Sequence, residues 1–230
     1  MKIGILTTPN NPFIKFRVHA LSNFLNISDL YIVYDESFNE ENYKKIWRDR
    51  YNLDEFKVTL DLKNIQTIFL KDHNNNNLIK YAKKNSIKYF INAGTPRKIS
   101  KEIVFNNYFK IINIHPGLFP SYRGANCLEW ALLNNDLLGS TAHFINDKYD
   151  DGIILKRILY RFDNIKNYKE LRTLALKQDI KLLSYVIKNI ENYSKKKKIC
   201  FQKKISKFYG IMSQSKLSSV KKIIKNGIKQ

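Results

Sequence analysis

A short region in the middle of the chain carries an amide, an imidazole and a carboxylate in an order that suits acyl transfer. Asn113 and His115 stand two residues apart at the end of an apolar run, and Asp150 follows in a polar stretch. An amide and a protonated imidazole can both donate hydrogen bonds to an oxyanion as it forms, which contributes about 3 kcal/mol per donor. A carboxylate beside the imidazole keeps it protonated and can accept the proton of an attacking amine. These residue types point to transfer of an acyl-type group.

The neighbouring residues predict the elements that position this set. Residues 109–114 form an apolar run that favours a strand. Alternate side chains of a strand point to the same side, so Asn113 and His115 face one small region. Pro116-Gly117 then turns the chain and exposes the edge of the imidazole. Asp150 stands in a loop between two further strands. Downstream we expect a helix at 125–134, strands at 139–146 and 153–160, and a long amphipathic helix at 167–193.

Strands and helices also alternate in the first half of the chain, which predicts an α/β fold. Strands are expected at residues 2–7, 30–34, 67–70 and 88–92, and helices at 13–25, 40–50, 77–85 and 99–106. Such alternation with short loops is typical of an open, mostly parallel, Rossmann-like sheet with helices on both faces. Ligands of these sheets bind beyond the carboxyl ends of the strands, where Asn113 and His115 lie. No Gly-x-Gly-x-x-Gly follows the first strand, which disfavours a nicotinamide dinucleotide.

The character of the sequence changes near residue 195, where four consecutive lysines begin. Residues 199–201 and 207–209 favour two short strands, and residues 213–226 favour a basic helix. We therefore expect a catalytic domain at 1–194 and a small basic appendage at 195–230, built as a β-hairpin and a helix.

The net charge of +21 admits two interpretations. A polyanionic partner, such as a nucleic acid or an anionic membrane face, attracts a basic protein. Lysine is spread along the whole chain together with many asparagines and isoleucines, however, so we favour a bias of overall composition. An anionic small substrate such as a sugar nucleotide also gains from a positive potential. Charge alone therefore does not select the substrate.

The sequence predicts neither a membrane segment nor a bound metal. No apolar run reaches the ~20 residues that cross a bilayer, and the residues from Met1 to Thr8 fit a first strand rather than a signal peptide. Cys127 and Cys200 fit neither a disulfide framework nor the spacing of metal ligands. We expect a reduced, cytoplasmic protein without a membrane span.

Each candidate residue has an ordinary structural explanation when it is taken alone. An asparagine near a strand end is often a turn residue. A histidine on a strand is often a satisfied buried group, which is how we interpret His143. Asp150-Asp151-Gly152 by itself is an ordinary turn. The order and spacing of the set from Asn113 to Gly152 carry the prediction.

Five segments together form a specific motif: Asn92-Ala93-Gly94-Thr95-Pro96-Arg97-Lys98-Ile99, Asn113-Ile114-His115-Pro116-Gly117-Leu118-Phe119-Pro120-x-Tyr122-Arg123-Gly124, Trp130-Ala131, Gly139-x-Thr141-x-His143 and Asp150-x-Gly152. This motif resembles that of the folate-dependent formyltransferases, which include glycinamide ribonucleotide, methionyl-tRNA and amino-sugar formyltransferases. The resemblance spans roughly residues 2–190. The family places an aspartate seven residues after the histidine of its Gly-x-Thr-x-His strand. This spacing selects Asp150 over Asp151 in the present chain.

The resemblance implies a role for each matching residue. Asn113 would hold the formyl oxygen, His115 would support the developing negative charge, and Asp150 would orient His115 and manage the amine proton. The formyl donor would be N10-formyltetrahydrofolate, which acts as a co-substrate, and no metal is implied. The acceptor must be a neutral primary amine. The residues implied to line the pterin are Arg97, Lys98, Ile99, Asp147, Lys148 and Tyr149.

Departures from the family pattern bear on the acceptor. The loop after the first strand, residues 7–12, lacks the glycine-rich sequence with which the purine enzyme cradles a phosphate. The methionyl-tRNA enzyme carries a further C-terminal β-barrel domain, which we do not expect here because 36 residues follow residue 194. The hydrolase of formyltetrahydrofolate carries an N-terminal regulatory domain, which we do not expect here because the first predicted strand begins at residue 2. Amino-sugar formyltransferases often carry a short C-terminal hairpin and helix for dimerisation, which fits the predicted appendage.

We therefore expect a homodimeric N-formyltransferase that acts on a nucleotide-linked amino sugar in the biosynthesis of a surface polysaccharide such as O-antigen. The residues expected near the acceptor are Thr8, Asn10, Arg123, Asn126 and Trp130, and Trp130 fits a core helix position equally well. The alternatives are a methionyl-tRNA-type enzyme with a reduced C-terminal domain, whose basic tail contacts RNA, and an enzyme like glycinamide ribonucleotide formyltransferase. A non-enzymatic member that binds folate or RNA is a further alternative.

Overall fold

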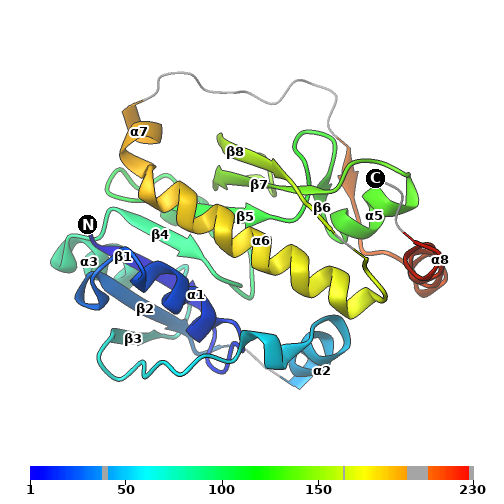
Figure 1. Cartoon of the computed structure of the whole chain (residues 1–230). Helices are drawn as coiled ribbons and strands as arrows, with labels where there is room; N and C mark the ends of the chain where they lie inside the picture. Colours follow the sequence, from blue (N-terminus) through cyan, green and yellow to red (C-terminus); the bar gives the residue numbers. More distant parts are fainter. Residues whose placement is uncertain (38–40, 163, 196–206, 228–230) are drawn as a thin grey trace. The chain divides into compact units, whose positions relative to one another are not determined.

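The computed structural model of the protein describes residues 1–37, 41–162, 164–195 and 207–227. A seven-stranded sheet has the strand order β3-β2-β1-β4-β5-β7-β8 (Figure 1). The strands β1 to β5 pair in parallel, and β8 runs antiparallel to β7. This confirms the predicted α/β fold with a mostly parallel sheet. The strands are β1 (Ile3–Thr7), β2 (Leu30–Asp35), β3 (Gln66–Leu70), β4 (Tyr89–Asn92), β5 (Lys110–His115), β7 (Gly139–Phe144) and β8 (Ile154–Leu159).

The chain divides into two compact units, which we describe separately. The first unit comprises Met1–Lys45, Leu53–Asn113 and Phe144–Lys148, and the second comprises Ile46–Asn52, Ile114–His143 and Tyr149–Gln230. The strand β5 begins in the first unit and ends in the second. The helix α2 (Glu41–Arg50) also contributes residues to both.

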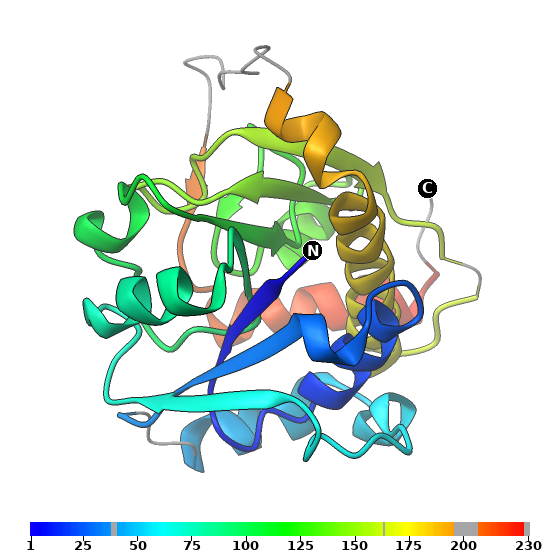
Figure 2. The same ribbon diagram turned by 90° about the vertical axis from the view of Figure 1, so that its left-hand side faces the viewer.

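In the first unit, helices lie on both faces of the parallel strands. Figure 2 shows α3 (Asn77–Asn85) and α4 (Lys101–Val104) on one face and α1 (Ile14–Ser22) on the other. The strand β1 is buried along its whole length, as its continuous apolar sequence predicts for a central parallel strand. Gly4 is required there because an added Cβ atom would lie 2.1 Å from the Phe90 ring. Two short 3-10 helices, which the sequence did not predict, span Ile27–Asp29 and Leu53–Phe56.

The second unit is built around its own apolar cluster. The helices α5 (Cys127–Leu133), α6 (Tyr168–Lys188), α7 (Ile190–Lys195) and α8 (Gln214–Lys225) belong to it. Leu128 of α5, Leu171 of α6 and Val220 of α8 are buried together in this cluster. The helix α6 begins at a capped end, because the Asn167 side chain accepts a hydrogen bond from the Glu170 N–H at 3.0 Å. Because Val220 of α8 belongs to the cluster, this C-terminal helix is part of the core of the second unit.

Three features of the C-terminal half differ from the expectation or extend it. The helix predicted at 167–193 is divided at Asn189, whose side-chain amide donates to the Tyr185 carbonyl at 2.8 Å and so competes with the helical pattern. The strand β9 (Phe208–Tyr209) pairs in parallel with β6 (Arg123–Gly124), which the sequence did not predict as a strand. The other half of the predicted hairpin, residues 199–201, lies outside the described residues. The predicted C-terminal helix is confirmed as α8. The boundary at residue 194 stays a prediction.

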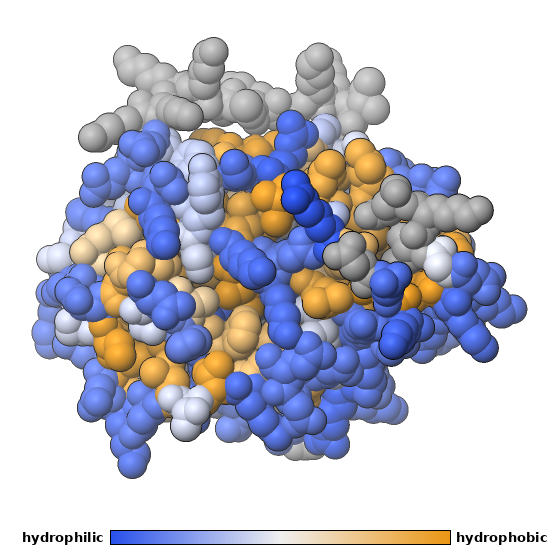
Figure 3. Space-filling view, viewed as in Figure 1, coloured by the Kyte–Doolittle hydropathy of each residue, from blue (hydrophilic) through white to orange (hydrophobic). Residues whose placement is uncertain are grey.

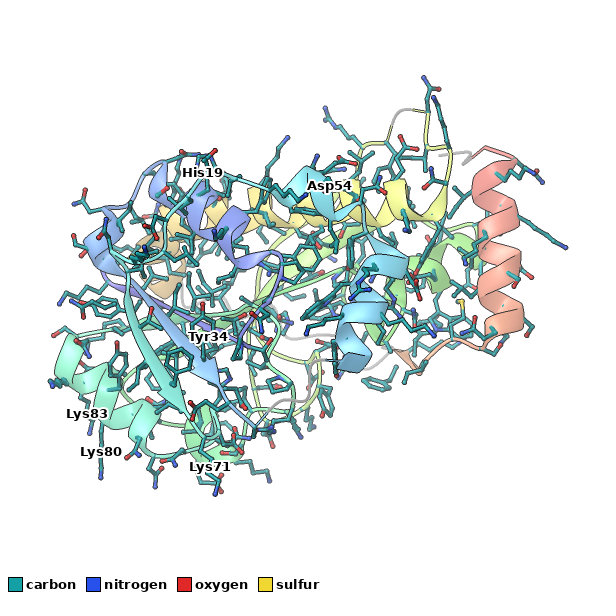
Figure 4. All side chains as sticks on the ribbon, turned by 90° about the horizontal axis from the view of Figure 1, so that it is seen from below. His19, Tyr34, Asp54, Lys71, Lys80 and Lys83 are labelled. Atoms are coloured by element: carbon teal, nitrogen blue, oxygen red, sulfur yellow. The ribbon has the colours of Figure 1, made fainter. Side chains whose placement is uncertain are left out.

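Several basic side chains of the first unit are exposed to solvent. Lys71, Lys80 and Lys83 are exposed, and their side chains project away from the ribbon (Figure 4). On the face drawn in Figure 3, hydrophilic side chains surround smaller apolar patches. Within the described ranges, no helix combines the length and the apolar character that a membrane crossing needs.

Candidate active site

The end of β5 brings His115 next to a carboxylate that is distant in sequence. The His115 Nδ1 atom lies 3.4 Å from Asp150 Oδ1, and both side chains are largely buried, with 7% and 16% exposure. His143 of β7 approaches the same oxygen with its Nε2 atom at 3.9 Å. The Phe119 ring lies 5.0 Å from each imidazole, measured between ring centroids. The second unit therefore assembles a buried carboxylate with two imidazoles.

Asp150 is held by the two residues of β6. The Gly124 N–H donates to Asp150 Oδ2 at 3.0 Å, and the Arg123 Nε–H donates to the Asp150 carbonyl oxygen at 2.6 Å. The same guanidinium donates to the Tyr149 carbonyl at 2.9 Å and pairs with Asp151 at 3.0 Å. Asp150 itself has a φ of 49°, a left-handed conformation that aspartate tolerates better than most residues. The loop thus presents the Asp150 carboxylate to His115 with its backbone fixed.

The surroundings of Asp150 favour its ionised form. Burial by itself raises the pKa of this carboxyl. The hydrogen bond and charge of His115, the charge of His143 and the Gly124 N–H act in the opposite direction and outweigh burial, so the pKa of Asp150 lies below its ordinary value. An ionised Asp150 accepts hydrogen bonds on both oxygens and orients the His115 ring.

The second ring nitrogen of His115 has a confined environment. Its Nε2 atom is buried and has no hydrogen-bond partner among the described residues. A Cβ atom added at Gly117 would lie 2.8 Å from this nitrogen and 2.6 Å from the Tyr122 carbonyl oxygen. Only glycine therefore fits the turn beside the imidazole. A buried polar atom without a partner is rare in proteins, and one at a strand end is a candidate for contact with a ligand.

Asn113 has a defined amide orientation within the first unit. Its Oδ1 atom accepts a hydrogen bond from the Asn92 amide at 3.2 Å. Asn92 in turn accepts hydrogen bonds from the backbone N–H groups of Gly94 and Thr95 at 3.2 and 3.0 Å. This arrangement commits the carbonyl side of the Asn113 amide to Asn92 and makes its NH₂ group the donor. Asn113 and His115 occupy alternate positions of β5, so their side chains point to the same side of the strand.

The segment after β4 is fixed by side chains from two neighbouring loops of the first unit. The Arg97 guanidinium lies 2.9 Å from Asp35 Oδ2 and 3.0 Å from Asp72 Oδ2, and it also donates to the Ser37 hydroxyl. Asn74 donates to the Lys98 carbonyl at 3.0 Å and accepts from the Ser100 N–H at 2.7 Å. The segment that was predicted to contact a pterin therefore has a defined conformation.

Further predicted contact residues have partners within their own unit. Ile99 is buried in the core of the first unit, and Asp147 lies 3.8 Å from Lys101. Tyr149, in the second unit, exposes 55% of its side chain. The assignment of these residues to a pterin site stays a prediction.

Sequence reasoning missed Asp35 and His73, which support this segment. Asp35 is fully buried at the end of β2 and accepts hydrogen bonds from the His73 N–H at 3.2 Å and the Ser37 hydroxyl at 2.6 Å. Burial lowers the pKa of His73, and this effect outweighs the opposing influence of the Val33 carbonyl and of Asp35, so His73 is neutral at physiological pH. The available signal was an aspartate that directly follows a buried strand.

The predicted acceptor residues of the second unit bind the backbone of the chain itself. Asn126 Oδ1 accepts a hydrogen bond from the Met212 N–H at 3.2 Å, and the Trp130 indole N–H donates to the Gly210 carbonyl at 3.1 Å. Arg123 holds the loop of Asp150 as described above. The expected contacts of these three residues with an acceptor stay predictions.

Thr8 and Asn10, the other predicted acceptor residues, lie in the first unit after β1. Thr8 is buried and Asn10 has a φ of 55°. Their neighbour Asn11 fixes this turn, because its amide donates to the Thr7 hydroxyl at 2.9 Å and to the Ala93 carbonyl at 2.7 Å. A role for Thr8 and Asn10 in binding the acceptor stays a prediction. Within the described ranges, no group of three or more histidine, cysteine or acidic side chains is arranged to hold a metal ion.

Comparison with known proteins identifies related sequences. The model of the formyl transferase family matches residues 44–187, well over half of the chain. The methionyl-tRNA formyltransferase of Campylobacter fetus is 33% identical over 129 residues, which cover 54% of this chain and 41% of that protein. The phosphoribosylglycinamide formyltransferase of Haemophilus influenzae is 27% identical over 130 residues, which cover 54% of this chain and 61% of that protein. The matched region thus spans about half the length of these curated relatives.

Solved structures share the fold at low sequence identity. A sugar N-formyltransferase from Shewanella superposes with a TM-score of 0.60 at 17% identity, covering 91% of this chain and 77% of that one. The phosphoribosylglycinamide formyltransferase from Anaplasma phagocytophilum gives 0.61 at 17% identity, covering 91% and 98%. An N-formyltransferase from Helicobacter canadensis, solved with folinic acid and dTDP-3-aminofucose, gives 0.54 at 18% identity, covering 91% and 71%.

Proposed function

Because the chain belongs to the formyl transferase family, we propose that it transfers the formyl group of N10-formyltetrahydrofolate to a primary amine. The buried pair of His115 and Asp150 at the end of β5 is the observation that carries this proposal. The pair supplies an oriented imidazole next to an ionised carboxylate. Asn113, two residues earlier on the same strand, adds an amide donor on the same side.

The proposed reaction gives each of these groups a role. The lone pair of the neutral amine attacks the formyl carbon, and the carbonyl oxygen becomes an oxyanion. The Asn113 amide and the His115 imidazole stabilise this charge, at about 3 kcal/mol per donor. Asp150 orients His115 and accepts the proton that the amine loses. The bond from the formyl carbon to N10 then breaks, and N10 receives the proton that Asp150 took from the amine, so that a formamide and tetrahydrofolate leave and Asp150 is ionised again.

The proposed donor site uses the segment Arg97–Ile99 together with Asp147 and Tyr149. Backbone groups of this segment are suited to reading the edge of a pterin, because the contacts of Arg97 with Asp35 and of Asn74 with Lys98 hold them in place. A rigid site reduces the entropy that is lost when a ligand binds. The partly exposed Tyr149 ring offers an aromatic surface to the ligand.

For the acceptor we propose a nucleotide-linked amino sugar, in the biosynthesis of a surface polysaccharide. The fold likeness to sugar N-formyltransferases supports this choice, as does the net charge of +21, which attracts an anionic substrate. A methionyl-tRNA acceptor is the second candidate, because a methionyl-tRNA formyltransferase is 33% identical over the matched region. With this first acceptor we also propose that the protein is a cytoplasmic homodimer.

An assay with a panel of acceptors tests the function. Each reaction contains the protein, N10-formyltetrahydrofolate and one acceptor. The acceptors are amino-sugar nucleotides, glycinamide ribonucleotide and methionyl initiator tRNA. We expect tetrahydrofolate release and a formylated product with an amino-sugar nucleotide only. Release with the tRNA alone, together with a binding affinity that falls steeply with salt, would establish the second candidate instead. The His115→Ala variant serves as the control that separates enzymatic transfer from spontaneous transfer, and its circular dichroism spectrum verifies the fold.

A further inference from the structure

The strand β6 that holds Asp150 has two residues, and its position depends on a partner. Gly124 pairs with Tyr209 of β9, and the next N–H along the chain, that of Ala125, donates to the Tyr209 carbonyl at 2.9 Å. The approach is close, since a Cβ atom at Gly124 would lie 2.2 Å from the Tyr209 carbonyl oxygen. The same short stretch therefore donates one N–H to the Asp150 carboxylate and the next N–H to the C-terminal segment.

Two side chains add to this connection. Asn126 accepts a hydrogen bond from the Met212 N–H at 3.2 Å, and the Trp130 indole donates to the Gly210 carbonyl at 3.1 Å. Tyr209 also stacks on Tyr122, with ring centroids 5.2 Å apart and an interplanar angle of 10°. Figure 1 shows β9 beside β6 and α8 beside α5.

We propose that the C-terminal segment Phe208–Met212 is a positioning element for Asp150, which acts within the same chain by holding β6 in place. Two-residue strands do not persist without partners. If the segment is loosened, the Gly124 N–H is no longer held against the carboxylate, although Asp150 and Gly124 are both still present. The catalytic consequence of this positioning rests on the function proposed above for Asp150.

The carboxylate of Asp150 should report the loosening through its protonation. Loss of the Gly124 donor removes one of the interactions that favour the ionised form. The other titratable and charged groups that face Asp150 are all still present in such a variant: His115 from β5, His143 from β7, Arg123 from β6, Cys127 from α5 and the adjacent Asp151. The expected change is a rise of the Asp150 pKa and a parallel shift of the acidic limb of the rate profile.

A double variant loosens the segment while Asp150 and both residues of β6 keep their identity. Asn126→Gly removes the acceptor for the Met212 N–H, and glycine accommodates the φ of 53° at this position. Trp130→Phe removes the indole donor and keeps an aromatic ring. Ile211→Ser is the matched control, because Ile211 belongs to the same segment and exposes 86% of its side chain. Leu174→Ala on α6, which packs against the same core, controls for a general loss of stability.

Two readouts are measured on the full-length protein. The pKa of Asp150 is followed by NMR with ¹³C-labelled aspartate, and kcat is measured against pH with N10-formyltetrahydrofolate and the accepted amine. In the double variant we expect the Asp150 pKa to rise and kcat at neutral pH to fall about tenfold, because hydrogen bonds to charged groups contribute about 1.5–3 kcal/mol and are here only partly lost. Ile211→Ser and Leu174→Ala should leave both the pKa and kcat unchanged.

An unchanged Asp150 pKa and an unchanged kcat in a folded double variant would overturn the proposal. An effect of Ile211→Ser that is equal to that of the double variant would also overturn it, because the segment would then act through its exposed surface. If the double variant unfolds, Trp130→Phe alone decides by the same two readouts. A raised pKa in a protein that transfers no formyl group to any acceptor would support the positioning and refute the proposed function.

Discussion

Gly117 offers a direct test of how closely the turn after β5 confines His115. In Gly117→Ala, the new Cβ atom would lie 2.6 Å from the Tyr122 carbonyl oxygen, 2.8 Å from Cys127 Cβ and 2.8 Å from His115 Nε2. Ordinary contacts of a Cβ atom begin near 3.4 Å, so the neighbours must move by 0.6 to 0.8 Å. The first two atoms belong to the backbone or lie next to it and have little freedom. The imidazole is the group that can turn away.

This displacement predicts two effects of measurable size. Overpacking of a buried site costs about 1–3 kcal/mol of the free energy of unfolding. A shift of a catalytic group by about 1 Å costs on the order of 100-fold in rate, so a shift of about half that size predicts a loss of roughly tenfold or more in kcat. Both effects arise from the same contacts and should appear together.

The assay compares Gly117→Ala with Gly210→Ala. An added Cβ atom at Gly210 meets no atom within 4 Å, so the second variant makes the same chemical change in open space. Urea unfolding gives the free energy of unfolding, and initial rates with N10-formyltetrahydrofolate give kcat. Gly210→Ala should stay within about 0.5 kcal/mol of the wild type. Wild-type stability and turnover in Gly117→Ala would refute the close confinement of the imidazole.

Three further predictions concern charged groups of the second unit. Asp150→Asn should lower turnover by more than ~100-fold. Because the folded-state pKa of Asp150 is lowered, the stability that its charge contributes above pH ~4 should be lost in acid. The free energies of unfolding of the variant and the wild type should therefore converge in urea titrations at acidic pH. Burial raises the pKa of Asp179 from 3.8 to about 6, so the stability that its protonated form contributes is complete below pH ~4 and is lost as the pH rises through 6. Asp179→Asn should therefore gain stability over the wild type from pH ~4 upward, to about 3 kcal/mol above pH 6 in urea titrations, and equal pH dependence of the two proteins would contradict this. In Arg123→Lys, the ammonium group cannot bind the carbonyl oxygens of Tyr149 and Asp150 at the same time, so kcat should fall about tenfold. A rise of KM for the acceptor with an unchanged kcat would instead assign Arg123 to acceptor binding.

The sequence predicted most of the elements because their signals are local. Apolar runs of strand length bounded by turn residues identified β1, β2, β4 and β5, and their order implied a parallel sheet. The two-residue strands β6 and β9 carry no periodic signal, and their pairing joins residues 85 positions apart. The break between α6 and α7 depends on one asparagine side chain, which no periodicity reports.

By itself, the sequence determined the candidate chemistry, because a strand end, a sharp turn and the spacing between His143 and Asp150 are properties of short segments. The tertiary structure decided which groups surround those residues. It brought Asp150 to His115 and to β6, and it engaged Arg97 with Asp35 across 62 positions of sequence. It also directed Asn126 to the Met212 backbone, 86 positions away. The reason is physical: a buried polar group takes whichever partner the packed chain places within reach, and that partner is fixed only when the distant segments meet.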